Sequence, residues 1–196
     1  MSKSAKFDRA DVVDKATKLY WEKGFHGTSM RNLHDVVDMR PGSIYATFGN
    51  KENLFKEALQ HYAQVSFARL SACKKASSSP LDALRTFVKS VLIDGGKSAP
   101  SGMCMLVKSV AELTVENAEL LSETKRLLSL IESEFAAIFK EAIEQGEISV
   151  SKDPKHLAQY LQIQVMGLRT YAGANDNALA IEALIDDIFD GSLIRG

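Results

Sequence analysis

The chain has 196 residues and a formal net charge of −1 at pH 7; 45% of its residues are hydrophobic and 25% are charged. This balance is typical of one globular domain or two small ones with a sizeable core, and it argues against a wholly basic nucleic-acid binder. No apolar run approaches the roughly 18 residues of a membrane span, the polar N-terminal stretch lacks the apolar core of a signal peptide, and the two cysteines make no disulfide framework, so we expect a cytoplasmic protein with reduced thiols and no membrane partner.

Apolar residues recur at three- and four-residue spacings along the chain, which only 4 prolines and 12 glycines interrupt. This pattern predicts an all-α fold of about nine helices, because proline and glycine disfavour helix interiors. The first helix is expected at about 9–23, where Gly24 ends it. A second helix follows Thr28 as its N-cap. Its inward-pointing side chains are expected to be Met30, Leu33, Val36 and Val37.

A short third helix begins near Pro41 and stops at Phe48-Gly49, after which Asn50 caps a long fourth helix to about Lys74. Five further helices are predicted at about 81–92, 103–113, 117–145, 153–172 and 177–189. We therefore divide the chain into an N-terminal domain, residues 1–50, and a helical domain, residues 51–196, with the helix over 51–74 connecting them. Residues 1–62 carry a net charge of +2 and the remainder −3, which is the sign expected if the N-terminal part meets phosphates.

Three helices within 50 residues, with a tight connection between the second and the third, predict a helix-turn-helix. The third helix would enter the major groove of DNA, and Gly42 and Ser43 allow its backbone to approach closely. Tyr45 adds a phenol that can donate a hydrogen bond, and Arg40 can neutralise a phosphate. Lys51, like Thr28, lies near a helix N-terminus, where backbone amides attract phosphate oxygens.

The stretches ATKLYWEKGFHGTSMRNL (16–33) and GSIYATFGNKENLF (42–55) resemble the DNA-binding domain of the TetR/AcrR family of repressors. The similarity covers about residues 9–60. Two positions depart from the family pattern, since Asp38 replaces the usual turn glycine and Arg40, before Pro41, replaces a small hydroxyl cap. The resemblance implies that the DNA-contacting residues are Thr28, Ser29, Arg40, Pro41, Gly42, Ser43, Tyr45, Thr47 and Lys51.

In that family the remaining helices build a ligand cavity and a dimer interface. By resemblance, the predicted cavity residues are Phe67, Phe87, Met103, Cys104, Met105, Phe135, Met166 and Tyr171. The predicted interface residues are Leu157, Tyr160, Leu161, Gln164, Leu168, Ile181, Leu184, Ile185 and Ile188. The alternative is that these side chains form the ordinary core of one subunit. Cys104, where a helix begins, is either a reactive thiol or a small buried residue.

The sequence lacks HExxH, zinc-type cysteine and histidine spacing, a phosphate-binding glycine loop and a Ser-His-Asp order, so we expect no enzyme, no metal and no cofactor. The resemblance implies a repressor that binds a palindromic operator as a homodimer and leaves it when an unidentified small molecule binds. Its partners would be double-stranded DNA, a second copy of the chain and that effector. Two alternatives remain open. One is a ligand-independent DNA binder or activator, and the other is an all-helical small-molecule carrier with a vestigial helix-turn-helix.

Overall fold

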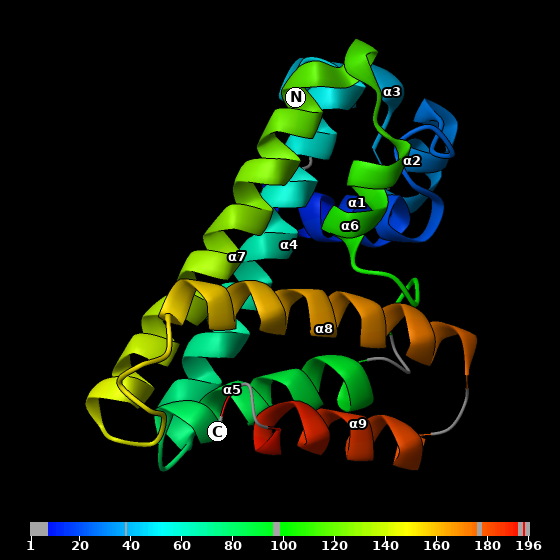
Figure 1. The fold of residues 1–196 in the computed structure, drawn as a ribbon. Coiled ribbons are helices and arrows are strands. Elements are labelled where there is room, and N and C mark those ends of the chain that lie inside the picture. Colours follow the sequence, from blue (N-terminus) through cyan, green and yellow to red (C-terminus); the bar gives the residue numbers. More distant parts are fainter. Residues whose placement is uncertain (1–7, 38, 96–98, 176–177, 192–193, 195–196) are drawn as a thin grey trace.

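The computed structural model describes residues 8–37, 39–95, 99–175, 178–191 and 194, and all regular secondary structure within them is helical (Figure 1). The predicted all-α fold is confirmed. The helices are α1 (Arg9–Lys23), α2 (Met30–Val37), α3 (Pro41–Phe48), α4 (Lys51–Ala76), α5 (Pro80–Lys89), α6 (Met105–Glu112), α7 (Ala118–Glu144), α8 (Pro154–Ala174) and α9 (Ala178–Asp190), with a π-helical turn η1 (Ser90–Asp94) after α5 and a 3-10 turn η2 (Val115–Asn117) before α7. None of the helices in the described part of the chain is long and apolar enough to cross a membrane.

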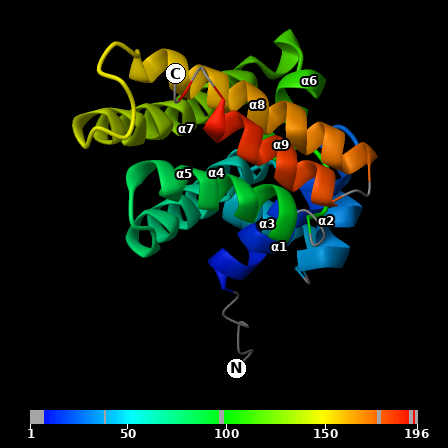
Figure 2. The same cartoon turned by 60° about the horizontal axis from the view of Figure 1, so that its bottom comes forward.

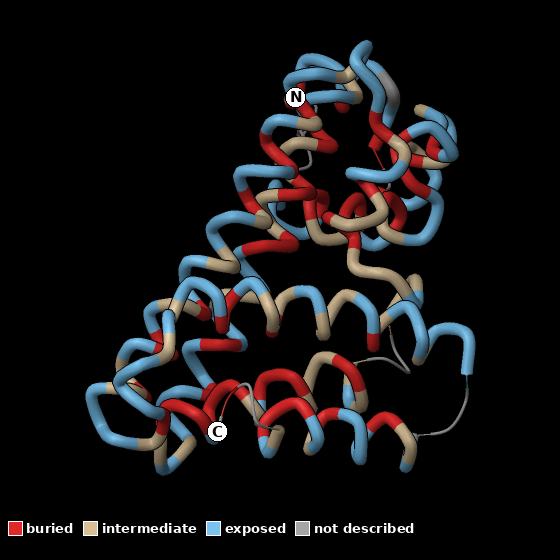
Figure 3. The backbone as a smooth tube through the Cα atoms, in the orientation of Figure 1, coloured by how far each residue is buried: buried red, intermediate tan, exposed pale blue. Residues whose placement is uncertain are grey.

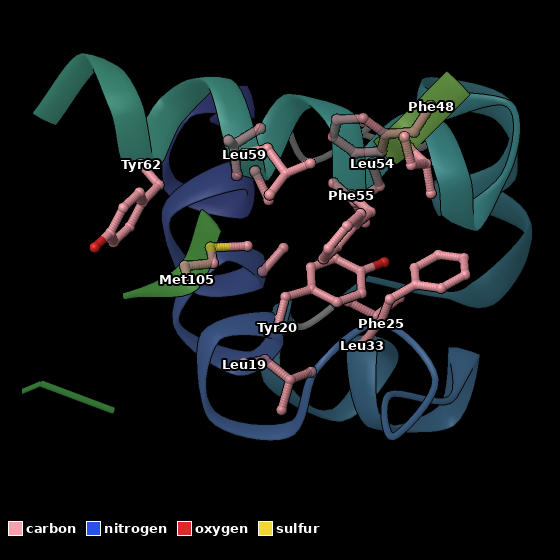
Figure 4. Packing of buried hydrophobic residues seen from close by; sticks show 14 of the residues in the cluster. Leu19, Tyr20, Phe25, Leu33, Phe48, Leu54, Phe55, Leu59, Tyr62 and Met105 are labelled. Atoms are coloured by element: carbon pink, nitrogen blue, oxygen red, sulfur yellow. The ribbon is translucent and has the colours of Figure 1, made fainter. Parts of the chain in front are cut away.

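Helices α1, α2 and α3 pack against the N-terminal half of α4 and form the first of two hydrophobic cores (Figure 4). Aromatic rings fill its centre. The ring centroids of Tyr20 and Phe55 lie 4.8 Å apart in an edge-to-face arrangement, and those of Phe25 and Phe55 lie 5.0 Å apart. Leu33 and Phe48 bring α2 and α3 into the same cluster. This small core orients the three N-terminal helices on the end of the long helix α4.

The second core lies at the other end of the molecule, where α5, α8 and α9 form a layer beneath the N-terminal helices (Figures 1 and 3). Leu70 and Cys73 from the last turns of α4 belong to it, as do Phe135 and Phe139 of α7. Helices α4 and α7 therefore run through both cores. The predicted boundary at residue 50 stays a prediction, and α4 connects the two clusters as one continuous helix.

The helix boundaries follow mostly from the predicted caps. The Asn50 side chain accepts a hydrogen bond from the Asn53 amide, and Asp153 accepts one from the Lys155 amide. Gly24 ends α1 with a φ of 79°, a conformation that glycine adopts without strain. The inward orientation predicted for Val36 is wrong, because its side chain is exposed. The predicted start of the last helix at residue 177 and the turn residue Asp38 lie outside the described residues.

A buried carboxylate joins α4 to α7 beside the N-terminal core. Gln60 of α4 donates to Glu123 Oε1 over 2.7 Å, and Arg126 Nε donates to Glu123 Oε2 over 2.7 Å. The hydrogen bonds from Arg126 and, to a smaller extent, Gln60 together lower the pKa of Glu123 to about 2, against the opposing effect of burial. The ionised form is therefore the one that the folded protein stabilises.

We predict that this carboxylate makes the fold sensitive to acid. Because the folded pKa is below the ordinary value of 4.5, the contribution of Glu123 to stability is fully present above that pH and is lost as the pH falls toward 2. Thermal unfolding followed from pH 7 to pH 2.5 should show that Glu123→Gln lowers Tm at neutral pH and flattens its decline in acid. Glu134→Gln, an exposed position on the same helix, is the control. Parallel pH profiles for the wild type and Glu123→Gln would contradict the prediction.

Candidate functional site

Helix α3 is anchored on one side and free on the other. Ile44 and Phe48, four residues apart, are buried in the N-terminal core, whereas Ser43 is exposed and Tyr45 is 48% exposed. Residues three or four apart share a helix face, so the buried pair fixes which side of α3 points outward. The helix therefore presents its hydroxyl groups away from the core.

Most of the predicted DNA-contacting residues are accessible around this face. Ser29, Arg40, Gly42, Ser43 and Tyr45 are exposed and Thr47 is half-buried, and Pro41 is the first residue of α3. A Cβ built on Gly42 would meet no atom within 4 Å, so the backbone there is open to a close approach. Arg40, the exposed N-cap residue of α3, does not cap the helix with its side chain.

The prediction for Thr28 is wrong, both as an N-cap and as a contact residue. Its side chain is buried and its hydroxyl donates to the Gly24 carbonyl over 2.7 Å, so it stabilises the turn that follows α1. Ser29 caps α2 instead. The Asn32 amide donates to Ser29 Oγ over 3.1 Å, and the Ser29 amide donates to Asn32 Oδ1 over 3.0 Å. This reciprocal pair, separated by three residues, was visible in the sequence as a capping box with asparagine in the third position.

Lys51 and Arg9 stack on aromatic rings beside α3. The Lys51 ammonium lies 4.2 Å from the centroid of the Phe25 ring, and partial burial lowers its pKa. The Arg9 guanidinium lies 4.5 Å from the centroid of the Phe48 ring and donates to the Thr47 carbonyl over 3.3 Å. Arg9 also forms a two-point ion pair with Glu57 of α4, so it fixes the start of α1 against the end of α3 and its charge is already compensated. Lys51 brings positive charge to the edge of the exposed face.

The predicted cavity residues do not form one cluster. Phe67, Cys104 and Met105 pack with the N-terminal core, while Phe87 and Phe135 pack with the second core, their ring centroids 5.8 Å apart. Met103 and Met166 are half-buried, and Tyr171 is exposed. The aromatic and methionine side chains thus divide between two cores that the sequence pattern could not separate.

The predicted dimer interface is corrected at six of its positions. Leu157, Leu161, Leu168, Ile181, Ile185 and Ile188 are buried in the second core of a single subunit. Tyr160 and Gln164 are half-buried and Leu184 remains exposed. The opposite face of α8 and α9 carries apolar side chains that the prediction missed, including Ile163, 65% exposed, and Leu179, 80% exposed. Helices α8 and α9 run side by side (Figure 2), and we refer to their exposed apolar side chains Ile163, Leu179 and Leu184 as the unpartnered face of α8 and α9.

Helix α6 holds the end of α1. The Lys108 ammonium donates to the carbonyls of Trp21 and Glu22 over 3.2 and 2.7 Å, which satisfies acceptors at the helix C-terminus. One turn later, Glu112 Oε1 accepts the Phe25 amide over 2.7 Å. A Cβ built on Gly24 would lie only 2.3 Å from Glu112 Oε2. The contact therefore requires both the carboxylate and a glycine, and we refer to it as the α6–α1 contact.

A polar cluster lies where α1, α4, the start of α6 and α8 meet. The Tyr62 hydroxyl, which points away from the apolar side chains of the core (Figure 4), donates to Cys104 Sγ over 3.4 Å and accepts from Arg169 Nη1 over 3.2 Å. Burial raises the pKa of Tyr62, so the phenol stays protonated. Trp21 Nε1 donates to the Met103 carbonyl over 2.7 Å, and the Trp21 ring lies edge-to-face on Tyr62 with centroids 5.0 Å apart.

The backbone of α8 also touches the segment that leads into α6. A Cβ built on Gly102 would lie 2.8 Å from the Cα of Gly173, and one built on Gly173 would lie 3.0 Å from the Cα of Gly102. Only two glycines can approach this closely. Among the described residues, no group of three or more histidine, cysteine or carboxylate side chains is placed to hold a metal ion.

Comparisons with known proteins agree with this architecture. Residues 12–58 match the model of the family described as bacterial regulatory proteins, tetR family. The HTH-type transcriptional repressor ComR of Escherichia coli K12 is 27% identical over 83% of this chain and 78% of its own length. The uncharacterised HTH-type regulator YezE of Bacillus subtilis is 26% identical over 82% of this chain and 84% of its own.

Solved structures show the same fold over nearly the whole chain. The TetR family regulator CifR, as a cysteine mutant complexed with a 26-base-pair operator DNA, superposes with a TM-score of 0.87 at 21% identity over 97% of this chain and 100% of its own. The reduced form of Escherichia coli NemR superposes with a TM-score of 0.81 at 20% identity over 95% of this chain and 97% of its own. With the family model over α1 to α4, the chain belongs to the TetR family of bacterial transcriptional regulators and carries its helix-turn-helix DNA-binding domain at the N-terminal end.

Proposed function

We propose that the protein is a repressor that binds a palindromic operator as a homodimer and leaves it when a small molecule binds. The observation that carries this proposal is the outward face of α3, where Ser43 and Tyr45 are exposed while Ile44 and Phe48 hold the helix in the core. A major groove admits one α-helix, and hydroxyl and phenol groups can bond base edges or phosphates there.

Dimerisation would supply the second half of the binding surface. One short recognition helix buries little area, and paired half-sites about one DNA turn apart, roughly 34–36 Å, are what a two-fold dimer reads. The unpartnered face of α8 and α9 supports this, because large exposed apolar side chains gathered on adjacent helices indicate an interaction surface. Two copies of such a face can form a four-helix interface that buries Ile163 and Leu179 of each subunit.

Release would require that the helical body change the position of the N-terminal domain. Two connections can carry that change, the continuous helix α4 and the α6–α1 contact. A ligand that favours one arrangement of α6 over another shifts the equilibrium between DNA-binding and free states by its difference in affinity for them, typically about 1–3 kcal/mol.

We predict that Tyr45→Ala weakens operator binding by roughly 5- to 150-fold, since one good contact to DNA is worth roughly 1–3 kcal/mol. Fluorescence anisotropy with DNA fragments from beside the protein's own gene measures the affinity, and circular dichroism checks the fold. Leu130→Ala, a partly exposed position on α7, is the control. Equal operator affinity for wild type and Tyr45→Ala would refute the role given to α3.

We predict that Ile163→Asp disrupts the dimer, because it would bury a charge in the apolar face of α8 and α9. Sedimentation velocity should show a monomer for Ile163→Asp and a dimer for the wild type. Val150→Asp introduces the same charge at a side chain that is also largely exposed but lies outside this face, and it should remain dimeric. A wild-type protein that is monomeric at micromolar concentration would refute the interface.

We predict that Glu112→Ala loosens the junction between α1 and α2. The Phe25 amide loses a hydrogen bond to a charged acceptor, which is worth roughly 1.5–3 kcal/mol. Hydrogen exchange at Phe25 should accelerate by about tenfold or more, and operator affinity should fall because α2 is less firmly placed. Lys125→Met, an exposed position on α7, should change neither quantity. Unchanged exchange at Phe25 would show that the α6–α1 contact does not hold this turn.

A further inference from the structure

A buried side chain of α8 lacks a hydrogen-bond partner. Gln162 Oε1 is inaccessible to solvent and accepts no hydrogen bond within the described part of the chain, while Gln162 Nε2 donates to the Leu128 carbonyl over 3.3 Å. The bond to a carbonyl assigns the amide orientation, because a flipped amide would oppose two acceptors. A buried acceptor without a hydrogen bond destabilises the folded protein, and a group that donates a hydrogen bond to it would remove that cost.

Two turns along the same helix, Arg169 lacks an acidic partner. Its guanidinium donates to the Tyr62 hydroxyl and lies 5.0 Å from the Trp21 ring centroid, and no carboxylate of the described residues pairs with it. The other described arginines of the C-terminal helices, Arg85 and Arg126, both have carboxylate partners. A half-buried guanidinium with unused donors in a fixed fork matches the geometry of a carboxylate.

Gln162, Met166 and Arg169 lie at i, i+4 and i+7, so they share one face of α8 over a rise of about 10.5 Å. This face looks into the region between the two hydrophobic cores. Ile131 of α7 packs against both cores, and Phe67 of α4 is half-buried against the N-terminal core. A polar acceptor at one end, a cation at the other and apolar side chains between them form an organised set of contacts.

We propose that Gln162, Met166 and Arg169 form the effector site, and that the effector is an organic anion with an apolar body and a hydrogen-bond donor at its far end. The anion would pair with Arg169 and the donor would satisfy Gln162 Oε1. This inference rests on the proposed function and names the ligand class for it.

The position of Arg169 connects the site to the DNA-binding domain. An anion that binds the guanidinium competes with the Tyr62 hydroxyl and with the Trp21 ring for it. Trp21 holds the Met103 carbonyl directly before α6, and its own carbonyl accepts from Lys108 of α6. Anion binding therefore acts on Trp21, which joins α1 to α6 and lies next to the α6–α1 contact.

Trp21 is the single tryptophan of the chain, so its fluorescence reports on this site without DNA. The probe is 4-hydroxyphenylacetate, which has a carboxylate, a ring and a phenol donor at opposite ends. We compare it with phenylacetate, which lacks the donor, and with 4-hydroxyphenylacetamide, which lacks the charge. A saturable change in Trp21 emission is expected with 4-hydroxyphenylacetate, at an affinity at least about tenfold above that of the amide.

Two variants assign the contacts. Arg169→Gln should lower the affinity for 4-hydroxyphenylacetate by about tenfold or more. Arg69→Gln, which changes an exposed arginine on α4, should leave that affinity unchanged. Gln162→Met should remove the preference for 4-hydroxyphenylacetate over phenylacetate and leave the thermal stability of the free protein equal or higher. Retained Tm in both variants shows that a loss of binding is not a loss of fold.

The outcomes separate the site from the function. No saturable response to either carboxylate, equal affinity for acid and amide, or full binding by Arg169→Gln would each overturn the site. Operator release is measured separately by anisotropy. If the carboxylate changes Trp21 emission but leaves operator affinity unchanged, the anion site is upheld and ligand-induced release is refuted. If a carboxylate still releases the operator from Arg169→Gln, release is upheld and the effector binds elsewhere.

Discussion

The rest of the structure depends on one constraint, which is that α4 belongs to both hydrophobic cores. Leu54, Phe55 and Leu59 pack in the N-terminal core, and Leu70 and Cys73 pack in the second. A continuous helix of 26 residues is about 39 Å long at 1.5 Å per residue, and a sharp kink within it would break backbone hydrogen bonds. Any rearrangement that keeps both cores intact must therefore move the two ends of the molecule together.

Polar contacts lie at the edge of the N-terminal core, where α1 and α4 meet α7 and α8. Gln60, Glu123 and Arg126 join α4 to α7, while Trp21, Tyr62 and Arg169 join α1, α4 and α8. Hydrogen bonds can exchange partners with small displacements, whereas interdigitated side chains resist them. Contacts of this kind can therefore rearrange at a smaller cost than the packing of either core.

Much of the fold could be predicted because helix periodicity, caps and glycine stops are local properties, as Asn50, Asp153 and Gly24 illustrate. The outward face of α3 was also predictable once the family pattern was recognised. The proposed dimer face was not, because α8 carries apolar residues on two sides and periodicity does not tell which side is left exposed; Leu161 lies inside and Ile163 outside. The cluster around Tyr62 escaped prediction since Arg169 is 107 residues away from it in sequence.

The close approach of Gly102 and Gly173 limits which substitutions these two positions can accept during evolution. The two backbones are in direct contact there. Neither position can therefore gain a methyl group unless α8 moves away from the segment that precedes α6. The two codons are therefore constrained as a pair, although both residues lie outside the helix-turn-helix. In related chains, a larger side chain at one position should coincide with a shifted or shortened C-terminal end of α8, and homologues with and without the pair would differ in where that helix stops.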